Sequence, residues 1–306
     1  MKWVNRERDE SVSRWPRMIL FGAIGLGLFL LCLALVLWWT WQSVVSRRLA
    51  EIRARGEPTT YAELDAYYAP PPADQDVTDL LLRAGRTLNM SEGTVETRKL
   101  PFVGEADDPP RPGRPWTELE LARQFLDDHA EPLRQLHEAA RRGGRARFDF
   151  LVGQNAITLP EGHLQALRAN ARALRLEANV RAHAEDATGA AATACDGLIL
   201  SNALQNEPFV VSQLVRMAIF GTAAHELKQL LPVTVFSDSD LSRLQEQLQS
   251  IDFADGPKSA LLGSRVEGIA IFKDPTTAGF AGWQVVLSRP LLDAAEGVYL
   301  GLMEEY

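Results

Sequence analysis

The stretch from Met18 to Trp41 constrains the fold most, because it is apolar almost throughout and contains no charged residue. At about 1.5 Å of rise per residue, a helix of this length crosses a hydrocarbon core of about 30 Å. The sequence therefore predicts one membrane-spanning helix over 18–41, in contact with the lipid bilayer. No other stretch of the chain is as long and as apolar.

A cleaved export signal is the alternative interpretation, since such signals also place basic residues before an apolar run. The run is longer than a usual signal core of about 7–15 residues, and no Ala-x-Ala-like cleavage site follows it. These features favour an uncleaved signal anchor. Tryptophan rings prefer the membrane interface, and four of them flank the run: Trp15, Trp38, Trp39 and Trp41.

The basic residues on either side of the span bear on its direction in the membrane. The tail before it carries five, and the flank after it carries four, so the excess on the N-terminal side is small. A short tail before a first span commonly stays inside. We therefore expect a single-pass protein of the inner membrane, with the N-terminus cytoplasmic and the large domain outside. Within the span, Ala23 and Gly27 would let two helices approach closely as a homodimer, although glycine is also common in membrane helices.

Four regions follow from the positions of the span and of the Gly and Pro residues. A short basic tail occupies 1–17, the transmembrane helix 18–41 and a helical stalk 42–57, which Gly56 and Pro58 end. We expect residues 58–306 to form one helical soluble domain. Within it, the Pro-rich and charged stretch 91–116 lacks helical periodicity and predicts a long loop, which is either functional or mobile.

Charge and cysteine content exclude several classes of function. The chain has a net charge of −8 and its first 46 residues carry +2, which leaves −10 for the remainder. An acidic domain repels phosphate backbones, so nucleic acid is not an expected partner. Cys32 lies in the span, which leaves Cys195 without an intradomain partner and excludes a disulfide framework or a cysteine-based zinc site. We interpret Cys195, in an Ala-rich helix, as a packed residue.

Apolar periodicity predicts a mainly α-helical, hairpin or bundle-like body. Residues 162–204 carry one apolar stripe, a turn and an Ala-rich helix, which resembles a helical hairpin of the tetratricopeptide type. Thr60 with Glu63 and Thr117 with Glu120 match capping boxes, and Ser237 matches an N-cap. Glu177 is placed to pair with Arg181 at i,i+4.

A minor two-stranded β element is predicted from two alternating stretches. Ala146, Phe148, Phe150 and Val152 alternate with polar residues over 145–152. The proposed partner strand is 282–288, where Trp283, Val285 and Leu287 alternate. Pairing of the two would close a small sheet across the helical body.

Charged residues inside apolar helices are candidates for structural ion pairs, because a buried charge is costly unless paired. Arg216 lies in the most apolar helix of the soluble domain, with Glu207 and Asp196 as candidate partners, and Arg265 with Glu267 forms a second candidate pair.

No complete catalytic or cofactor signature is present, and the sequence predicts neither a cofactor nor a metal. His225-Glu226 begins a zinc-protease pattern, but Gln229 stands where the second histidine is required. Asp238 and Asp240 precede an apolar helix and are interpreted as acidic first-turn residues. His129 is expected to be a hydrogen-bonded core histidine. One alternative is a hydrolase site assembled in space from dispersed residues, namely His163, His183, His225, Asp238 and Asp240.

Three stretches, Asn206 to Ile219, Leu261 to Gly268 and Ser288 to Met303, together with the single span before them, resemble an uncharacterised bacterial family of single-span helical proteins. Members often carry Glu where Ser264 stands, so an ion network through that Glu is not expected here. The resemblance implies a membrane-anchored helical body and no activity. We therefore expect a protein-binding or scaffold module of the cell envelope, with the 91–116 loop and the helical hairpin as contact surfaces, and the anchored hydrolase as the alternative.

Overall fold

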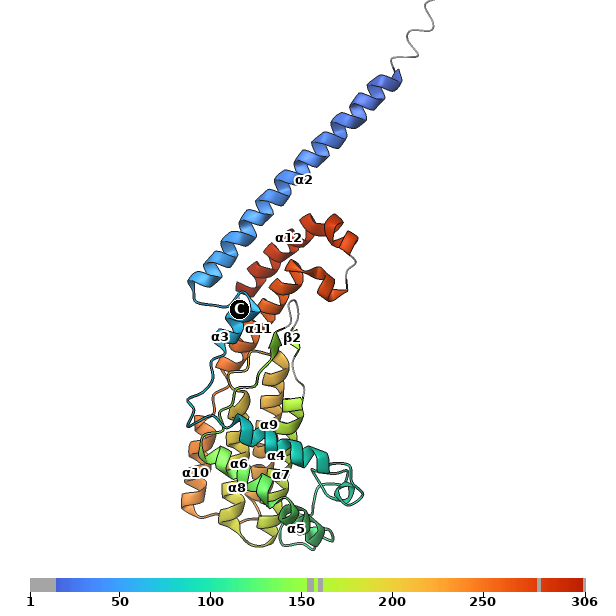
Figure 1. Ribbon diagram of the computed structural model, residues 1–306. Helices are drawn as coiled ribbons and strands as arrows, with labels where there is room; N and C mark the ends of the chain where they lie inside the picture. The colour runs from blue at the N-terminus through green and yellow to red at the C-terminus, as the bar shows by residue number, and fades with distance from the viewer. Residues whose placement is uncertain (1–14, 153–156, 159–161, 280–281, 305–306) are drawn as a thin grey trace, which may run out of the picture. The chain divides into compact units, whose positions relative to one another are not determined.

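The computed structural model describes residues 15–152, 157–158, 162–279 and 282–304, and it is mainly α-helical (Figure 1). The chain divides into two compact units. One contains the described residues up to Glu57 together with those from Ile269 onward, and the other is Pro58–Gly268. The predicted boundary near 57 coincides with this division. Residues 269–306, expected in the soluble domain, instead belong with the N-terminal helix.

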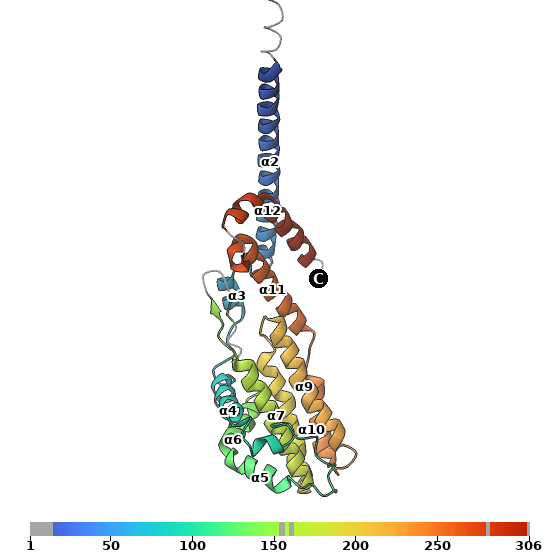
Figure 2. The ribbon, with the colours of Figure 1, turned by 90° about the vertical axis from the view of Figure 1, so that its right-hand side faces the viewer.

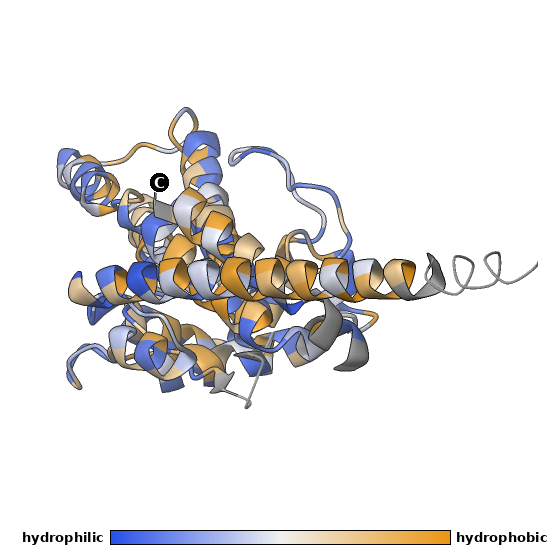
Figure 3. Ribbon diagram, turned by 90° about the horizontal axis from the view of Figure 1, so that it is seen from above, coloured by the Kyte–Doolittle hydropathy of each residue, from blue (hydrophilic) through white to orange (hydrophobic). Residues whose placement is uncertain are grey.

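The N-terminal helix α2 (Trp15–Ala54) is continuous, so the predicted span and stalk form one rod. Apolar side chains cover its first part and are exposed, and the hydropathy colouring shows this along most of the helix (Figure 3). Among the described residues, α2 is the helix long and apolar enough to cross a membrane. Ala23 and Gly27 lie on its exposed surface.

The same unit contains the 3₁₀ helix η3 (Pro275–Ala278) and α12 (Gly282–Glu304). Helix α12 packs along the second half of α2 (Figure 1). Val45, Ile52, Ile269 and Leu300 form the small apolar core between them. The prediction of a strand over 282–288 is wrong, because these residues form the first turns of α12.

The unit Pro58–Gly268 contains most of the remaining helices. They are α3 (Tyr61–Tyr67), α4 (Thr78–Ser91), η1 (Thr97–Lys99), α5 (Leu119–Asp128), α6 (Ala130–Arg141), α7 (Gly162–His183), α8 (Ala187–Leu200), η2 (Ser201–Leu204), α9 (Val210–Leu230) and α10 (Asp238–Ser250). Helix α11 (Asp255–Lys273) extends across the boundary between the units.

The hairpin of α7 and α8 is the centre of this unit and confirms the prediction for 162–204. Helix α7 is buried along most of its length, since α4, α8 and α9 pack on it (Figure 2). Small residues allow the close approach: a Cβ on Gly85 of α4 would come within 2.5 Å of Ala166 on α7. The core therefore requires glycine at that position.

The predicted β pairing is wrong, and a much shorter β element stands near its first stretch. Strand β1 (Leu151–Val152) pairs antiparallel with β2 (Ile157–Thr158), a local hairpin. The preceding residues are not a strand, yet Ala146, Phe148 and Phe150 are buried, as their alternation indicates.

Two of the three predicted helix N-caps are present in the structure. The Thr60 hydroxyl accepts from the Glu63 amide, and Ser237 forms a capping box with Asp240. The prediction of a cap at Thr117 is wrong, because α5 begins two residues later and its N-cap residue is Glu118, whose side chain makes no capping hydrogen bond.

Candidate functional site

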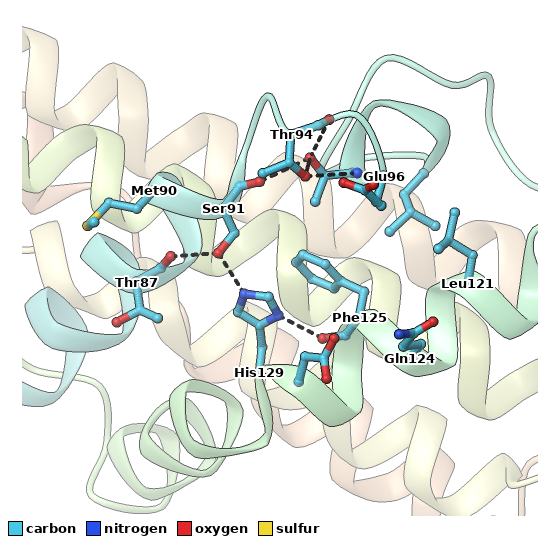
Figure 4. Close-up of a pocket in the computed structure, with 12 residues that line it drawn as sticks. Thr87, Met90, Ser91, Thr94, Glu96, Leu121, Gln124, Phe125 and His129 are labelled. Carbon is cyan, nitrogen blue, oxygen red and sulfur yellow. Dashed lines mark hydrogen bonds between the residues drawn. The ribbon is translucent and has the colours of Figure 1, made fainter.

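A cavity of about 610 Å³ lies between the C-terminal end of α4, the first part of the 91–116 segment and α5 (Figure 4). Apolar side chains, among them Leu100, Leu121 and Phe125, form part of its lining. Four hydroxyl residues also line it, namely Thr87, Ser91, Thr94 and Thr97. The charged lining residues are Glu96 and Asp128, and no Lys or Arg is among them.

Two local features of the sequence place the cavity walls. The buried face of α4, with Leu81, Ala84 and Leu88, holds that helix in the main core. On the other side, α5 ends at Asp128 and α6 starts at Ala130, so the helix breaks at His129, three residues before Pro132. Proline lacks an amide donor and is tolerated only in a first turn. Pro132 therefore stands in the first turn of the new helix α6.

Ser91 and His129 meet at one side of the cavity. The Ser91 Oγ lies 2.6 Å from His129 Nε2, and His129 Nδ1 lies 2.7 Å from the carbonyl oxygen of Phe125 (Figure 4). A carbonyl oxygen only accepts, so Nδ1 carries a proton. In the neutral ring, Nε2 is then free to accept the hydroxyl proton of Ser91, for which the Thr87 carbonyl oxygen at 3.0 Å from Oγ competes. The expectation of a hydrogen-bonded His129 is confirmed, and the residue also borders a cavity.

The 91–116 segment is an ordered wall of this cavity. Leu100, Val103 and Trp116 insert into the main core, and the buried Thr97 hydroxyl donates to the Ser91 carbonyl oxygen at 3.0 Å. A Cβ on Gly104 would come within 1.8 Å of the Thr97 carbonyl oxygen, so only glycine fits there. The stretch therefore belongs to the packed structure and fixes the end of α4.

A second polar cluster joins α6, α7 and α8. His137 Nδ1 lies 2.7 Å from Asp196 Oδ2, and its Nε2 lies 3.0 Å from Glu177 Oε2. Arg181 also binds Glu177 at 2.7 Å, which confirms the predicted i,i+4 pair. Hydrogen bonds to Asp196 and Glu177 raise the pKa of His137 to about 9.

This cluster predicts a pH-dependent stability. The folded pKa of His137 lies above its unfolded value of about 6.5, so its contribution is complete below pH 6.5 and is lost as the pH rises through about 9. We expect His137→Gln to cost on the order of 2 kcal/mol at pH 6 and much less at pH 9.5.

Thermal unfolding of the detergent-solubilised full chain across this pH range measures the difference. His225→Gln is the matched control, because His225 is exposed on α9. A cost of His137→Gln that does not change with pH would contradict the assignment of the cluster.

The predicted partners of Arg216 are corrected. Glu207 bonds to His163 at 2.9 Å and Asp196 bonds to His137. Arg216 is 0% exposed, donates from Nη2 to the Asp252 carbonyl oxygen at 2.6 Å and lies over the Phe253 ring. Burial lowers the pKa of its guanidinium.

The second candidate ion pair is also corrected. Arg265 is buried and donates to the Pro58 carbonyl oxygen at 3.4 Å, while Glu267 lies on the exposed side of α11.

Cys195 is buried, as predicted, and burial raises the pKa of its thiol to about 11.

The dispersed set proposed for a hydrolase does not converge. His163 bonds to Glu207, the His183 ring lies tilted against Trp116, and His225 contacts Gln229. Asp240 forms the capping box of α10 with Ser237, and Asp238 is exposed. Within the described part of the chain, no group of three His, Cys, Asp or Glu could hold a metal.

Sequence reasoning missed Ser91 and His137 as members of polar sites. Their partners lie 38 and 59 residues away, and no local motif connects such positions. The interface tryptophans were predicted from composition, and the structure adds a partner for one of them: Trp38 donates to Asp293 at 2.8 Å.

Comparison with known protein families, with curated proteins and with solved structures finds no match.

Proposed function

We propose that this chain is a single-pass, membrane-anchored binding protein of a bacterial inner membrane, and that a protein partner engages the cavity beside Ser91 and His129. Helix α2 supports the anchor by its length and its exposed apolar surface. The short basic tail before the span supports a cytoplasmic N-terminus and a helical domain outside.

A topology measurement tests the anchor and its direction. Val235 is exposed in the helical domain, so Val235→Cys in a Cys32→Ala, Cys195→Ala background offers one accessible thiol. Labelling by a membrane-impermeant reagent in intact cells would support the proposed direction. Labelling only after lysis would reverse it, and recovery of the chain in the soluble fraction would overturn the anchor.

The lining of the cavity carries the proposal of a protein partner. Apolar walls with two acidic residues and no basic residue fit a basic side chain on an apolar stem, because the stem is buried while the charge meets a carboxylate. The net charge of −10 after the first 46 residues attracts the same kind of partner. We infer that the partner presents a Lys or Arg from an exposed segment.

Site-specific photocrosslinking in living cells tests this proposal. A photoreactive residue at Met90, which lines the cavity and is exposed, is expected to capture one discrete partner. The same residue at Val235 is the matched control. Glu96→Lys with Asp128→Lys should reduce the Met90 adduct by more than tenfold. An adduct that survives both charge reversals, or equal adducts at the two positions, would contradict the proposal.

The Ser91–His129 hydrogen bond favours a second candidate function, an anchored serine hydrolase. In this mechanism Ser91 Oγ bonds to an acyl carbon and its proton passes to His129 Nε2, which then protonates the leaving group. Water, deprotonated by the same nitrogen, releases the acid and restores Ser91. The Phe125 carbonyl oxygen keeps the ring oriented.

A fluorophosphonate probe distinguishes the two functions. A hydrolase is expected to be labelled at Ser91, with labelling abolished by Ser91→Ala and reduced at least 100-fold by His129→Gln, because the general base is lost. Ser250→Ala, at an exposed serine at the end of α10, should leave labelling unchanged. Absence of labelling in the wild-type chain would eliminate this candidate and leave the binding function.

A further inference from the structure

Helix α12 has its polar and apolar faces reversed relative to a helix in water. Leu291, Val298 and Leu302 are 75%, 55% and 54% exposed, and with exposed Ala295 they follow one stripe at i, i+4, i+7 and i+11. The acidic residues Asp293 and Glu296 are buried. A helix facing water places its charged residues outward. The stripe on α12 therefore fits an apolar neighbour, above all at Leu291, its most exposed member.

The buried acidic residue Asp293 ties α12 to the end of the apolar run of α2. Its Oδ2 accepts hydrogen bonds from Trp38 Nε1 and Gln42 Nε2, both at 2.8 Å, and its Oδ1 lies 3.0 Å from Arg289 Nε. Trp38 is one of the residues that mark the end of the span, where indole rings favour the headgroup level. Asp293 consequently lies at the same level.

Helix α12 runs in the same direction as α2. After Asp293 at the level of Trp38 and Gln42, Gly297 lies against the Trp41 ring and Gly301 lies against Arg48. At about 1.5 Å per residue, Leu291 is about 3 Å on the membrane side of Asp293, and Leu302 is about 16 Å beyond Leu291. The headgroup region is only about 5–8 Å thick on each side.

We propose that the first part of this stripe, from Leu291 to Val298, lies in the headgroup and acyl-chain boundary of the bilayer that α2 crosses, so that α12 begins as an interfacial segment that runs along α2. This inference rests on the proposed membrane anchor. It makes the lipid surface the apolar neighbour, and it explains why acidic side chains face α2 while leucine and valine face outward. Leu302 lies beyond the headgroups on this geometry and provides an internal reference.

Depth measurements on the full chain in phosphatidylcholine–phosphatidylglycerol vesicles test the inference. Single cysteines replace Leu291, Val298 and Leu302 in the Cys32→Ala, Cys195→Ala background and carry nitroxide labels. Collision with oxygen, which concentrates in lipid, is compared with collision with a water-soluble nickel chelate. Leu28→Cys within the span is the lipid reference, and Val235→Cys is the water reference.

We expect the ratio of oxygen to nickel accessibility to fall from position 291 to position 298 and to reach the water value at position 302. A water value at 291 with a lipid value at Leu28 would overturn the interfacial segment and leave the anchor intact. A water value at Leu28 would overturn the anchor itself. Equal protection of 291, 298 and 302 from both reagents, relieved on dilution with lipid, would identify a second copy of the chain as the neighbour instead.

Discussion

Replacement of Glu226 by leucine is expected to destabilise the helical unit by about 3 kcal/mol, because it leaves buried donors without their acceptor. Glu226 is buried on α9, where Oε2 lies 3.0 Å from Arg175 Nε and Oε1 accepts from the amide of Asn179. Burial raises the pKa of this carboxyl group, which the hydrogen bonds from Arg175 and Asn179 oppose. Glu226→Leu would remove the nearer and more buried of the two carboxylates beside Arg175 and leave only Asp108, whose Oδ2 lies 3.7 Å from Arg175 Nη2.

The double variant Arg175→Met, Glu226→Leu is the matched control. With both charges replaced by apolar groups of similar size, most of the lost stability should return, since a buried ion pair and an apolar pair are often close in free energy. The midpoint of thermal unfolding should fall by roughly 6–12 °C in the single variant and recover in the double variant. Additive losses in the double variant would mean that the two side chains act independently.

The second large effect is expected at Leu167, which is 0% exposed in the first third of α7. Leu167→Ala removes buried apolar groups and leaves a cavity that the packed helices around it close only in part, so we expect a loss of about 3 kcal/mol. Leu167→Met keeps the volume and should cost less than about 1.5 kcal/mol. Leu241→Ala, at an exposed site on α10, should change the free energy of unfolding by less than about 0.5 kcal/mol.

Chemical unfolding followed by far-ultraviolet circular dichroism measures all three variants. Equal losses for Leu167→Ala and Leu241→Ala would show that α7 is not the packing centre of the unit.

Features set by neighbouring residues could be predicted from the sequence. The hairpin of α7 and α8 is specified within about 40 residues. The apolar stripe of α7, the Ala-rich sequence of α8 and the turn between them each favour the same hairpin. The break near Pro132 and the cap at Ser237 follow from backbone chemistry in the same way. The long apolar part of α2 follows from composition and length alone.

Polar partnerships between distant helices could not be predicted. The burial expected for its helix predicts an acidic side-chain partner for Arg216. In the structure, Arg216 donates instead to the backbone carbonyl oxygen of Asp252. A backbone acceptor of this kind leaves no trace in the pattern of side chains. Ser91 and His129 come together only because α4 and α5 pack across a shared core. Acidic residues are common in this chain, so charge alone does not select among them.

The strand predicted over 282–288 failed for a different reason. Alternation over seven residues fits a strand, but a short apolar window also fits a helix, and only the length of the element separates the two. Here the helix continues to Glu304, through Pro290. The stretch is the start of α12, a helix that packs against α2, and it does not pair with the segment before β1.

The hydrogen bond between Trp38 and Asp293 joins residues 255 positions apart. Trp38 is therefore synthesised well before its partner exists. At about 5–20 residues per second, the ribosome needs roughly 13–50 s after completing Trp38 before it reaches Asp293. During that interval the side of α2 that carries Val45 and Ile52 has no α12 to cover it. The apolar core between α2 and α12 can therefore form only after α12 has been synthesised, and a ribosome that stalls before α12 leaves that surface of α2 uncovered.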